Sequence, residues 1–378
     1  MPVTFVTLSA TALTRRPTVS YRRRPMLNGE LGSTILGVAG AIAFEERVRR
    51  LEPLRLARRQ TEFVVTVALH GGYCLQRQYD AFVSRSHGQV ACDFFNRLIA
   101  ERLATRIQIA RHRGYIYHLR AKGLYRALGQ EDNRNRRSTS AAQIARKLMV
   151  LDYVLATESR EWLATEQDKV AVLTNRLKVP AVDLPQRHFR SRDRSRAPTD
   201  RYFLNKLPIR VRDGDSRVEF VYLVLDKSGA GLETFLKDHA RLLRRLRCST
   251  IICICSREFD GLPACRRVFP RALETMLTSG NIEFDRDDLQ WFFRKRPEVD
   301  RNDLRAFSIA DLDRYRELRE QFATEEFERL FRSWQALGDG ALIDDERRRD
   351  NSPPPQVNMV EYTLPFAYEQ FGSWPGLA

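Results

Sequence analysis

The sequence predicts a mixed α+β fold in which an N-terminal helical module precedes a small α/β domain and a helical C-terminal region. Apolar residues recur at helical spacing between positions 59 and 103, and two short alternating segments follow with a glycine-containing turn between them. A second strand–helix–strand pattern begins after position 200. With 378 residues, of which 43% are hydrophobic and 30% charged, the chain is long enough for two domains with their own cores.

The charge balance favours a nucleic-acid partner. The formal net charge is +16 at pH 7, and most of the basic excess is arginine. The planar guanidinium binds phosphate bidentately, so this excess favours nucleic acid over an acidic small substrate. A GC-rich genome would explain arginine in place of lysine, but it would not explain the net charge.

The cysteines lie in apolar patterns without a CxxC pair, which predicts buried free thiols in a reducing cytosol. We therefore expect no disulfide, no metal and no cofactor. No segment is long and apolar enough to span a membrane, so a soluble cytoplasmic, nucleoid-associated bacterial protein is expected. The six cysteines are Cys74, Cys92, Cys248, Cys253, Cys255 and Cys265.

Residues 1–57 are expected to form a basic, partly disordered tail. Arginines lie there among Ser and Thr, and no acidic residue precedes Glu30. The composition is also that of a transit peptide, but a mobile tail or an over-long start site fits the remaining sequence better.

Residues 58–129 follow the element order of a winged helix-turn-helix. The first predicted helix ends at Gly71-Gly72, and a short basic turn joins the two strands. A short helix, 122–128, closes the module. The other expected elements are helices at Arg59–His70, about Leu75–Val83 and about His87–Leu103, a turn at Ser84–His87, and strands at Ala104–Ala110 and Tyr115–Leu119.

The third helix of this module divides into an apolar and a polar face. At 100° per residue the apolar side chains fall on one side, and hydrogen-bonding groups of the kind that read base edges fall on the other. A solvated surface helix has the same division, and Ser86 with Gln89 also fits a capping box. The apolar face holds Val90, Phe94, Phe95, Leu98 and Ile99, and the polar face holds Gln89, Asp93, Asn96 and Arg97.

The predicted hairpin presents Arg111, His112 and Arg113 at its tip. Basic side chains there could contact the DNA phosphates or insert into the minor groove. A charged tip is also ordinary for a solvated turn. The strand before it alternates Thr105, Ile107 and Ile109, as expected of a half-buried strand. The full set of predicted DNA contacts is Ser86, His87, Gln89, Asp93, Asn96, Arg97, Arg111, His112, Arg113, Tyr115, Arg134, Arg136 and Arg137.

Residues 130–199 are expected to be a helical connector and an arginine-rich linker. The segment 130–140 is either a solvated linker or a supplementary contact to the DNA backbone. A helical region from Ala141 to about Leu177 is either a packing partner or a dimerisation helix. The arginine-dense segment 186–199 is the predicted domain junction. The helical spacing rests on Ile144, Leu148, Leu151, Leu155 and Trp162.

Residues 200–337 are expected to form the small α/β and helical domain, and residues 338–378 a mostly disordered tail that includes Pro353–Pro355. The strand–helix–strand pattern predicts a crossover in a small mixed sheet. The expected strands are 206–212, 218–225 and 250–255, and the expected helices are 232–246, 265–278 and 309–337.

Two pairs of segments resemble a known family. The RRQTEFVV opening and the GYIYHL strand, followed by VEFVYLVLDKSG and ETFLKDHARLL, resemble winged helix-turn-helix proteins of the replication-relaxation type from plasmids and integrative mobile elements. The resemblance covers about 58–260 in layout. It implies a second domain with a degenerate restriction-endonuclease-like fold and a role in replication or transfer of a mobile element, or in its control.

The second domain lacks a nuclease pattern. Such sites need an acid on one strand and D/E-x-K on the next, and Asp213, Asp215, Glu219 and Asp226-Lys227 do not have that spacing. The charged residues of the following helix, Glu233, Lys237, Asp238 and His239, are expected to form a solvated face. We therefore predict no enzymatic activity.

The sequence predicts a sequence-specific double-stranded DNA-binding protein that acts in transcriptional control or in replication or transfer of a mobile element. We expect it to form a homodimer or to bind a protein partner through the second domain. Two alternatives remain: a metal-dependent nuclease or nicking enzyme targeted by the winged helix, and a winged helix used for protein–protein contact.

Overall fold

A computed structural model describes residues 41–83, 88–108, 114–157, 159–189, 199–212, 217–278, 286–301, 305, 307–322, 325–342 and 355–368. The chain forms two compact units, and both contain helices and strands, so the fold is mixed α+β. The first unit consists of Met1–Val172, Ile254–Asp260 and Tyr362–Ala378, and the second of Leu173–Cys253 and Gly261–Glu361. The units therefore divide at Val172 and not at the predicted junction near position 199.

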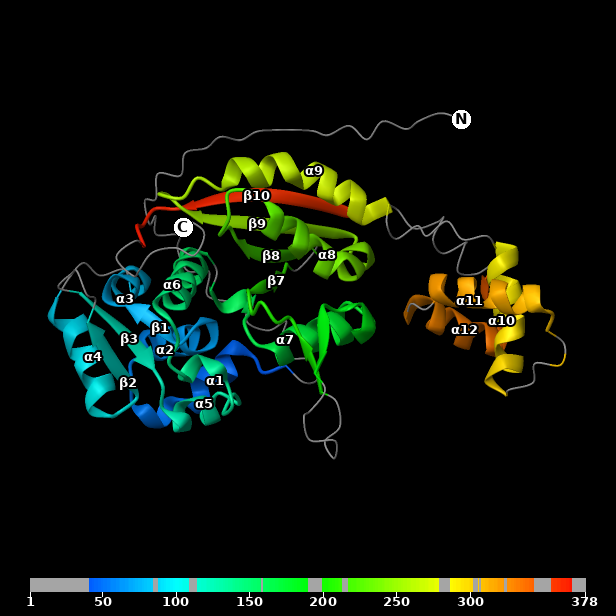
Figure 1. The fold of residues 1–378 in the computed structure, drawn as a ribbon. Helices are drawn as coiled ribbons and strands as arrows, with labels where there is room; N and C mark the ends of the chain where they lie inside the picture. Colours follow the sequence, from blue (N-terminus) through cyan, green and yellow to red (C-terminus); the bar gives the residue numbers. More distant parts are fainter. Residues whose placement is uncertain are drawn as a thin grey trace. The chain divides into compact units, whose positions relative to one another are not determined.

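The first unit contains a helix–strand–helix–helix sequence followed by two strands (Figure 1). These elements are α2 (Arg58–His70), β1 (Tyr73–Leu75), α3 (Gln76–Val83), α4 (Gln89–Ala100), β2 (Ala104–Gln108) and β3 (Tyr115–Leu119). Around them lie α1 (Phe44–Arg50), the 3-10 helices η1 (Glu52–Leu54) and η2 (Arg134–Arg136), α5 (Lys122–Ala127) and α6 (Ala141–Ala156).

The helices and the two strands predicted for residues 58–129 form, with small shifts of their ends. The predicted turn at Ser84–His87 lies outside the described residues. Strand β1 was not predicted: it pairs antiparallel with β3, so the sheet runs β1-β3-β2. Gly72 permits this arrangement, because its φ of 79° is left-handed and a Cβ there would lie 2.6 Å from the Asn135 carbonyl oxygen.

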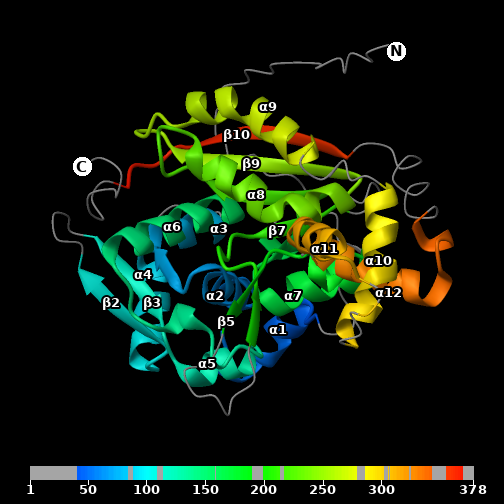
Figure 2. The ribbon, with the colours of Figure 1, turned by 45° about the vertical axis from the view of Figure 1, so that its right-hand side comes forward.

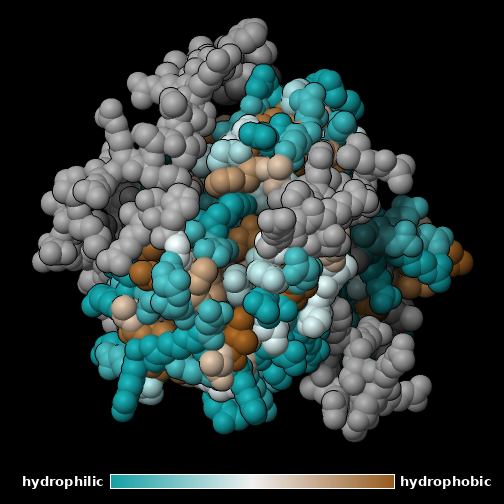
Figure 3. Space-filling view, turned by 90° about the vertical axis from the view of Figure 1, so that its left-hand side faces the viewer, coloured by the Kyte–Doolittle hydropathy of each residue, from teal (hydrophilic) through white to brown (hydrophobic). Residues whose placement is uncertain are grey.

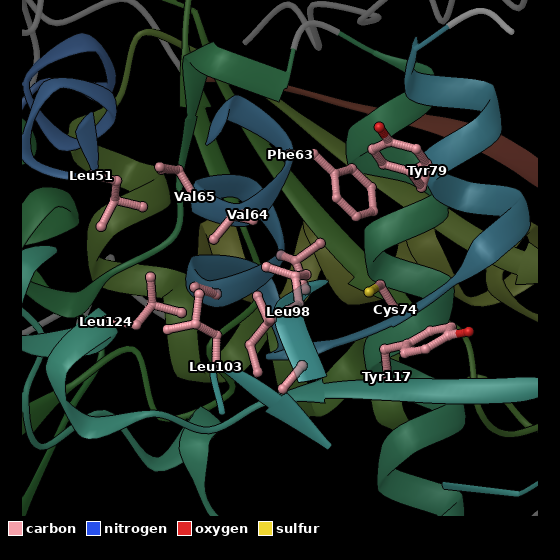
Figure 4. Packing of buried hydrophobic residues seen from close by; sticks show 14 of the residues in the cluster. Leu51, Phe63, Val64, Val65, Cys74, Tyr79, Leu98, Leu103, Tyr117 and Leu124 are labelled. Carbon is pink, nitrogen blue, oxygen red and sulfur yellow. The ribbon is translucent and has the colours of Figure 1, made fainter. Parts of the chain in front are cut away.

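Aromatic side chains from α2, α3, α4 and β3 hold the first unit together. Figure 4 shows Phe63, Tyr79 and Tyr117 among the aliphatic side chains of the same core. The rings of Phe63 and Tyr79 lie 5.2 Å apart, those of Tyr79 and Phe94 4.4 Å, and those of Phe95 and Tyr117 3.8 Å. Such stacked and edge-to-face pairs add to the free energy of burying the rings. The core therefore fixes α4 against α2, α3 and β3.

The predicted basic tail, residues 1–57, is partly wrong. Helix α1 packs against α2, and Val48 and Leu51 are buried in the core of the first unit. Val48 lies on the inner face of α1 and Leu51 follows that helix directly, so residues 44–54 belong to the fold. Residues 1–40 lie outside the described residues.

Helix α6 is a packing partner of the preceding helices. Leu151 joins their core, and the Gln78 amide donates a hydrogen bond to the Leu148 carbonyl, 3.1 Å away. The helical region predicted from Ala141 to about Leu177 forms in separate pieces, because α6 ends at Ala156 and a short strand interrupts the helices that follow. Trp162 lies in β4 (Trp162–Leu163), and its indole N–H donates a hydrogen bond to the Thr157 hydroxyl. Helix α7 (Glu166–Ala171) and a π-helical turn (Val172–Arg176) follow.

Apart from the last residues of β9 and β10, which belong to the first unit, the second unit contains a sheet in the order β10-β9-β8-β7 (Figures 1 and 2). Strands β8 and β9 are neighbours joined through α8, as predicted, and α8 packs against α9. The elements are β7 (Ile209–Val211), β8 (Val218–Leu223), α8 (Ala230–Arg245), β9 (Cys248–Ser256), α9 (Leu262–Thr278) and β10 (Gln356–Leu364).

Two predictions for the second half of the chain are corrected, and one helix was missed. The segment predicted as a loop, 186–199, begins and ends in the antiparallel strands β5 (Gln186–Phe189) and β6 (Thr199–Tyr202). The helix predicted for 309–337 is two helices, and a third that was not predicted precedes them. These are α10 (Arg286–Asp300), α11 (Ile309–Gln321) and α12 (Glu325–Leu337), which share an aromatic core.

The predicted disordered tail, 338–378, is also wrong over part of its length. Residues 356–364 form β10, and Tyr368 is fully buried. The proline run suggested disorder, but the strand that follows it adds to a sheet whose other members lie far away in the sequence. In the described part of the chain, no helix combines the length and apolar character needed to cross a membrane.

Candidate nucleic-acid interface

Helix α4 presents a single outward stripe. Its inner face is buried through Ala91, Phe94, Phe95 and Leu98. At 100° per residue the opposite side is centred on positions 89, 93, 96 and 100, and all four of those residues are exposed. Two predicted members of the apolar face differ from expectation, because Val90 is 48% exposed and Ile99 is only half-buried.

Helix α4 begins at Gln89 itself, and Ser86, the other member of the predicted capping box, lies outside the described residues. The residue before the helix is Gly88, whose φ of 112° favours glycine, and no side chain caps the helix there. The Gln89 amide nitrogen instead donates a hydrogen bond to Asp93 Oδ1, 2.6 Å away. Gln89 is therefore an outward-facing residue of α4, while Ser86 and His87 lie outside the described residues.

Arg97 is anchored within the protein. Its Nε donates to Glu101 Oε1 at 2.7 Å, and its two terminal nitrogens donate to the carbonyl oxygens of Leu54 at 2.7 Å and Arg55 at 3.1 Å. Arg55 has a left-handed φ of 49°, and its N–H bonds back to Glu52 to close η1. Arg97 thus fastens α4 to the end of η1, a role that the helical wheel does not reveal.

The hairpin after α4 carries one exposed arginine that the sequence analysis did not select. The Arg106 guanidinium lies 4.4 Å from the centre of the Tyr115 ring, a cation–π contact that keeps the charge at the strand surface. Only Ala104 of β2 is buried and Ile107 is 36% exposed, so the predicted half-buried alternation is wrong for the described part of β2. Arg111, His112 and Arg113 lie outside the described residues.

The connector after α5 is docked and is not a solvated linker. Asn135 is buried, and its amide donates to the carbonyl oxygens of Ala68 and Leu69 at 3.2 and 3.1 Å. Its own carbonyl oxygen lies 2.9 Å from His118 Nε2. The neighbouring side chains reach the surface: Arg134 and Arg137 are exposed and Arg136 is half-buried.

Part of the arginine excess is used inside the first unit. The buried Glu62 carboxylate forms ion pairs with Arg58, Arg59 and Arg160 at 3.2, 3.1 and 2.7 Å. These arginines outweigh the effect of burial and hold the pKa of Glu62 below its ordinary value. Because these arginines are paired within the protein, the net charge overstates how many arginines can contact a phosphate backbone.

The α4 stripe is polar but carries no positive charge. It presents the amides of Gln89 and Asn96, the carboxylate of Asp93 and the methyl group of Ala100. Figure 3 faces the side on which α4 and β2 lie in Figure 1, and hydrophilic residues cover much of it with smaller hydrophobic areas between them. Any binding of phosphate near α4 must therefore rely on neighbouring segments such as β2, where Arg106 lies.

The thiols agree with the sequence analysis with one exception. All six cysteines are free, and Cys92 is exposed on α4, whereas a buried thiol was expected there. The other cysteines are buried or half-buried. Within the described ranges, no group of three or more His, Cys, Asp or Glu side chains is arranged to hold a metal ion.

Two acids of the second unit that were considered as metal ligands, Glu219 and Asp226, have partners within the protein. Glu219 pairs with Arg210 and, at 2.8 Å, with Arg212. Asp226 Oδ1 accepts hydrogen bonds from the Ser228 N–H at 3.0 Å, the Ser228 hydroxyl at 2.7 Å and the Gly229 N–H at 2.6 Å. Asp213 and Asp215 lie outside the described residues.

The bonds to Asp226 have an electrostatic consequence. Partial burial acts to raise the pKa of this carboxyl, but the donors of Ser228, Gly229 and Gly231 outweigh it and hold the pKa below its ordinary value. His239, predicted on a solvated face, is instead buried, with its ring stacked 4.0 Å from that of Phe235. Glu233, Lys237 and Asp238 are exposed, as expected.

Comparisons of the chain with family models, with curated proteins and with solved structures found no match.

Proposed function

We propose that residues 58–129 form a winged helix-turn-helix and that the protein binds double-stranded DNA sequence-specifically, with α4 in the major groove and the β2–β3 hairpin as the wing. The observation that carries this proposal is the division of α4. One face is locked into an aromatic core, and the other presents Gln89, Asp93 and Asn96 to solvent. A helix that contacts base edges needs a rigid support and short hydrogen-bonding side chains of this kind.

The topology around α4 supports the same proposal. The order α2-β1-α3-α4-β2-β3, with the sheet order β1-β3-β2, places a two-stranded hairpin directly after α4. Arg106 projects from that hairpin, where a phosphate contact would add affinity for any sequence. The resemblance in layout to replication-relaxation proteins points to transcriptional control or to replication or transfer of a mobile element as the biological role.

The test measures binding of a labelled duplex between 50 and 200 mM salt. Each phosphate contact contributes roughly 0.9 to the slope of log K against log salt, so Arg106→Ala should weaken binding to all duplexes and flatten the slope by about one. Arg49→Ala is the matched control, because Arg49 is exposed on α1, outside the proposed interface. Arg111→Ala combined with Arg113→Ala should act in the same direction as Arg106→Ala.

The two alternatives predict different results. Binding that does not depend on salt, or no binding to duplex by the folded protein, would favour a protein–protein role for the module. Nicking of supercoiled plasmid in Mg²⁺ or Mn²⁺ that is lost in Asp226→Ala would favour a nuclease. Such nicking is not expected, because Asp226 already accepts hydrogen bonds from Ser228, Gly229 and Gly231.

A further inference from the structure

The outward stripe of α4 has an unusual chemistry for a helix that is proposed to lie in a major groove. Gln89 and Asn96 each offer an amide with both a donor and an acceptor, Asp93 offers acceptors alone, and Ala100 offers a methyl group. None of these side chains supplies the paired charged donors of a guanidinium. The bases that suit this set differ from those that suit an arginine.

Adenine matches the amides. Its major-groove edge presents an acceptor at N7 beside a donor at N6, and an amide satisfies both with one donor and one acceptor. Guanine presents acceptors at N7 and O6, which the Asp93 carboxylate would repel. Cytosine presents a donor at N4, but Asp93 Oδ1 already accepts a hydrogen bond from Gln89. Thymine presents a methyl group, and the exposed apolar surface of Val90 and Ala100 on α4 suits it.

The bond between Gln89 and Asp93 prepares Gln89 for this contact. The amide nitrogen has two N–H groups, and one of them donates to Asp93 Oδ1 at 2.6 Å. The second N–H and the carbonyl oxygen remain for a base edge. Asp93 therefore acts as a positioning residue for Gln89. Asn96 is exposed, and no hydrogen bond from another described residue holds its amide.

Arg97 is the residue of α4 that could read guanine, and its contacts oppose that role. Three of its five N–H groups donate to Glu101, Leu54 and Arg55, so reaching a base would break the attachment of α4 to η1. Its side chain also projects about 80° away from Gln89 around the helix axis at 100° per residue.

We infer that α4 reads A·T base pairs in preference to G·C pairs, with Gln89 and Asn96 as the adenine-reading residues and Arg97 as a positioning residue. This inference rests on the proposed DNA binding and adds the class of target sequence to it. Sequence preference then comes from the amides of Gln89 and Asn96. They are seven positions apart on one stripe, which is about two turns of α4.

The experiment is selection from a random-sequence duplex pool with the full-length wild type, Asn96→Ala, Arg97→Ala and Arg97→Lys. The matched control is Asn205→Ala, because Asn205 is an exposed asparagine of the second unit. The wild-type consensus should contain A·T pairs at its most selective positions. Asn96→Ala should lose preference at one of them, with discrimination lowered roughly 5- to 150-fold, while Asn205→Ala should select the wild-type consensus.

The arginine variants separate reading from positioning. If Arg97 positions α4, both Arg97 variants should select the wild-type consensus, and Arg97→Lys should regain part of the affinity that Arg97→Ala loses. A consensus with an invariant guanine that Arg97→Ala relaxes would overturn the inference and leave the proposed function intact. No enrichment by the folded wild type would overturn both.

Discussion

A buried carboxylate links three segments of the first unit and supports a quantitative prediction. Asp152, on α6, accepts both arms of the Arg77 guanidinium from α3, at 2.6 and 2.8 Å, and the hydroxyl of Tyr368 at 2.5 Å. The ring of Phe366 lies 3.6 Å from the same guanidinium. Replacement of Asp152 by alanine should therefore loosen α3, α6 and the segment 366–368 together.

The expected magnitude follows from the burial of the partners. Removing one member of a fully buried ion pair costs about 3–5 kcal/mol, because the other charge is left without compensation. The Arg77 side chain is 32% exposed, so water offsets part of that cost. The hydroxyl of the fully buried Tyr368 would also lose its acceptor, which costs about 1–3 kcal/mol. We expect a total of about 3 kcal/mol for Asp152→Ala.

Hydrogen exchange detected by mass spectrometry is the suitable assay, since a chain of two units need not unfold in one step. Asp152→Ala should speed exchange in α3, α6 and residues 362–368 by about two orders of magnitude, given that 1.4 kcal/mol is a factor of ten. Tyr368→Phe removes only a hydroxyl and should cost about 1 kcal/mol. Arg126→Ala, at an exposed pair with Glu131, is the control and should leave exchange in α3 and α6 unchanged. Unchanged exchange in Asp152→Ala, or an equal effect of Tyr368→Phe, would refute the reasoning.

Two further predictions concern His118 and Asp226. Burial, supported by the charges of Lys147 and Arg120, lowers the pKa of His118 below its ordinary value of 6.5 against the opposing effect of the Asn135 carbonyl. The unfolded state then binds the proton more readily, so stability should fall as the pH drops below about 6.5, by at most about 1.4 kcal/mol per pH unit. Urea unfolding of wild type and His118→Phe across pH 5 to 8 tests this, and parallel curves would contradict it. Asp226→Ala should cost about 1–2 kcal/mol through loss of the bonds that order the start of α8; unchanged exchange protection at residues 229–233 would contradict that role.

Local periodicity predicted most of the first unit well. Helices α2 and α4 and strand β3 form where their apolar spacing placed them, because each buries one face against the same core. The predicted inner face of α4 was largely right, and the exposure of Gln89, Asp93 and Asn96 follows from the same helical wheel. Val90 was misplaced, because it lies at the edge of that face, where the wheel does not decide between burial and exposure.

Contacts between residues that lie far apart in the sequence could not be predicted in this way. Strand β1 is three residues long and has no periodicity of its own; it exists because β3 pairs with it. Strand β10 follows a proline run that predicted disorder, and it pairs with β9, which lies about a hundred positions earlier. Helix η1 is fastened by Arg97, whose partners lie more than forty positions away.

The sequence by itself determined the order of the elements, the mixed α+β class and the two faces of α4, since these depend on residue spacing along a single helix or strand. The tertiary structure decided which polar side chains remain available to a partner. Arg97 and Gln89 belong to the same predicted polar face, yet the carbonyl oxygens of Leu54 and Arg55 hold Arg97, while Gln89 bonds along its own helix to Asp93. The physical reason is that a hydrogen bond depends on distance in space, and folding brings together donors and acceptors that the sequence keeps apart.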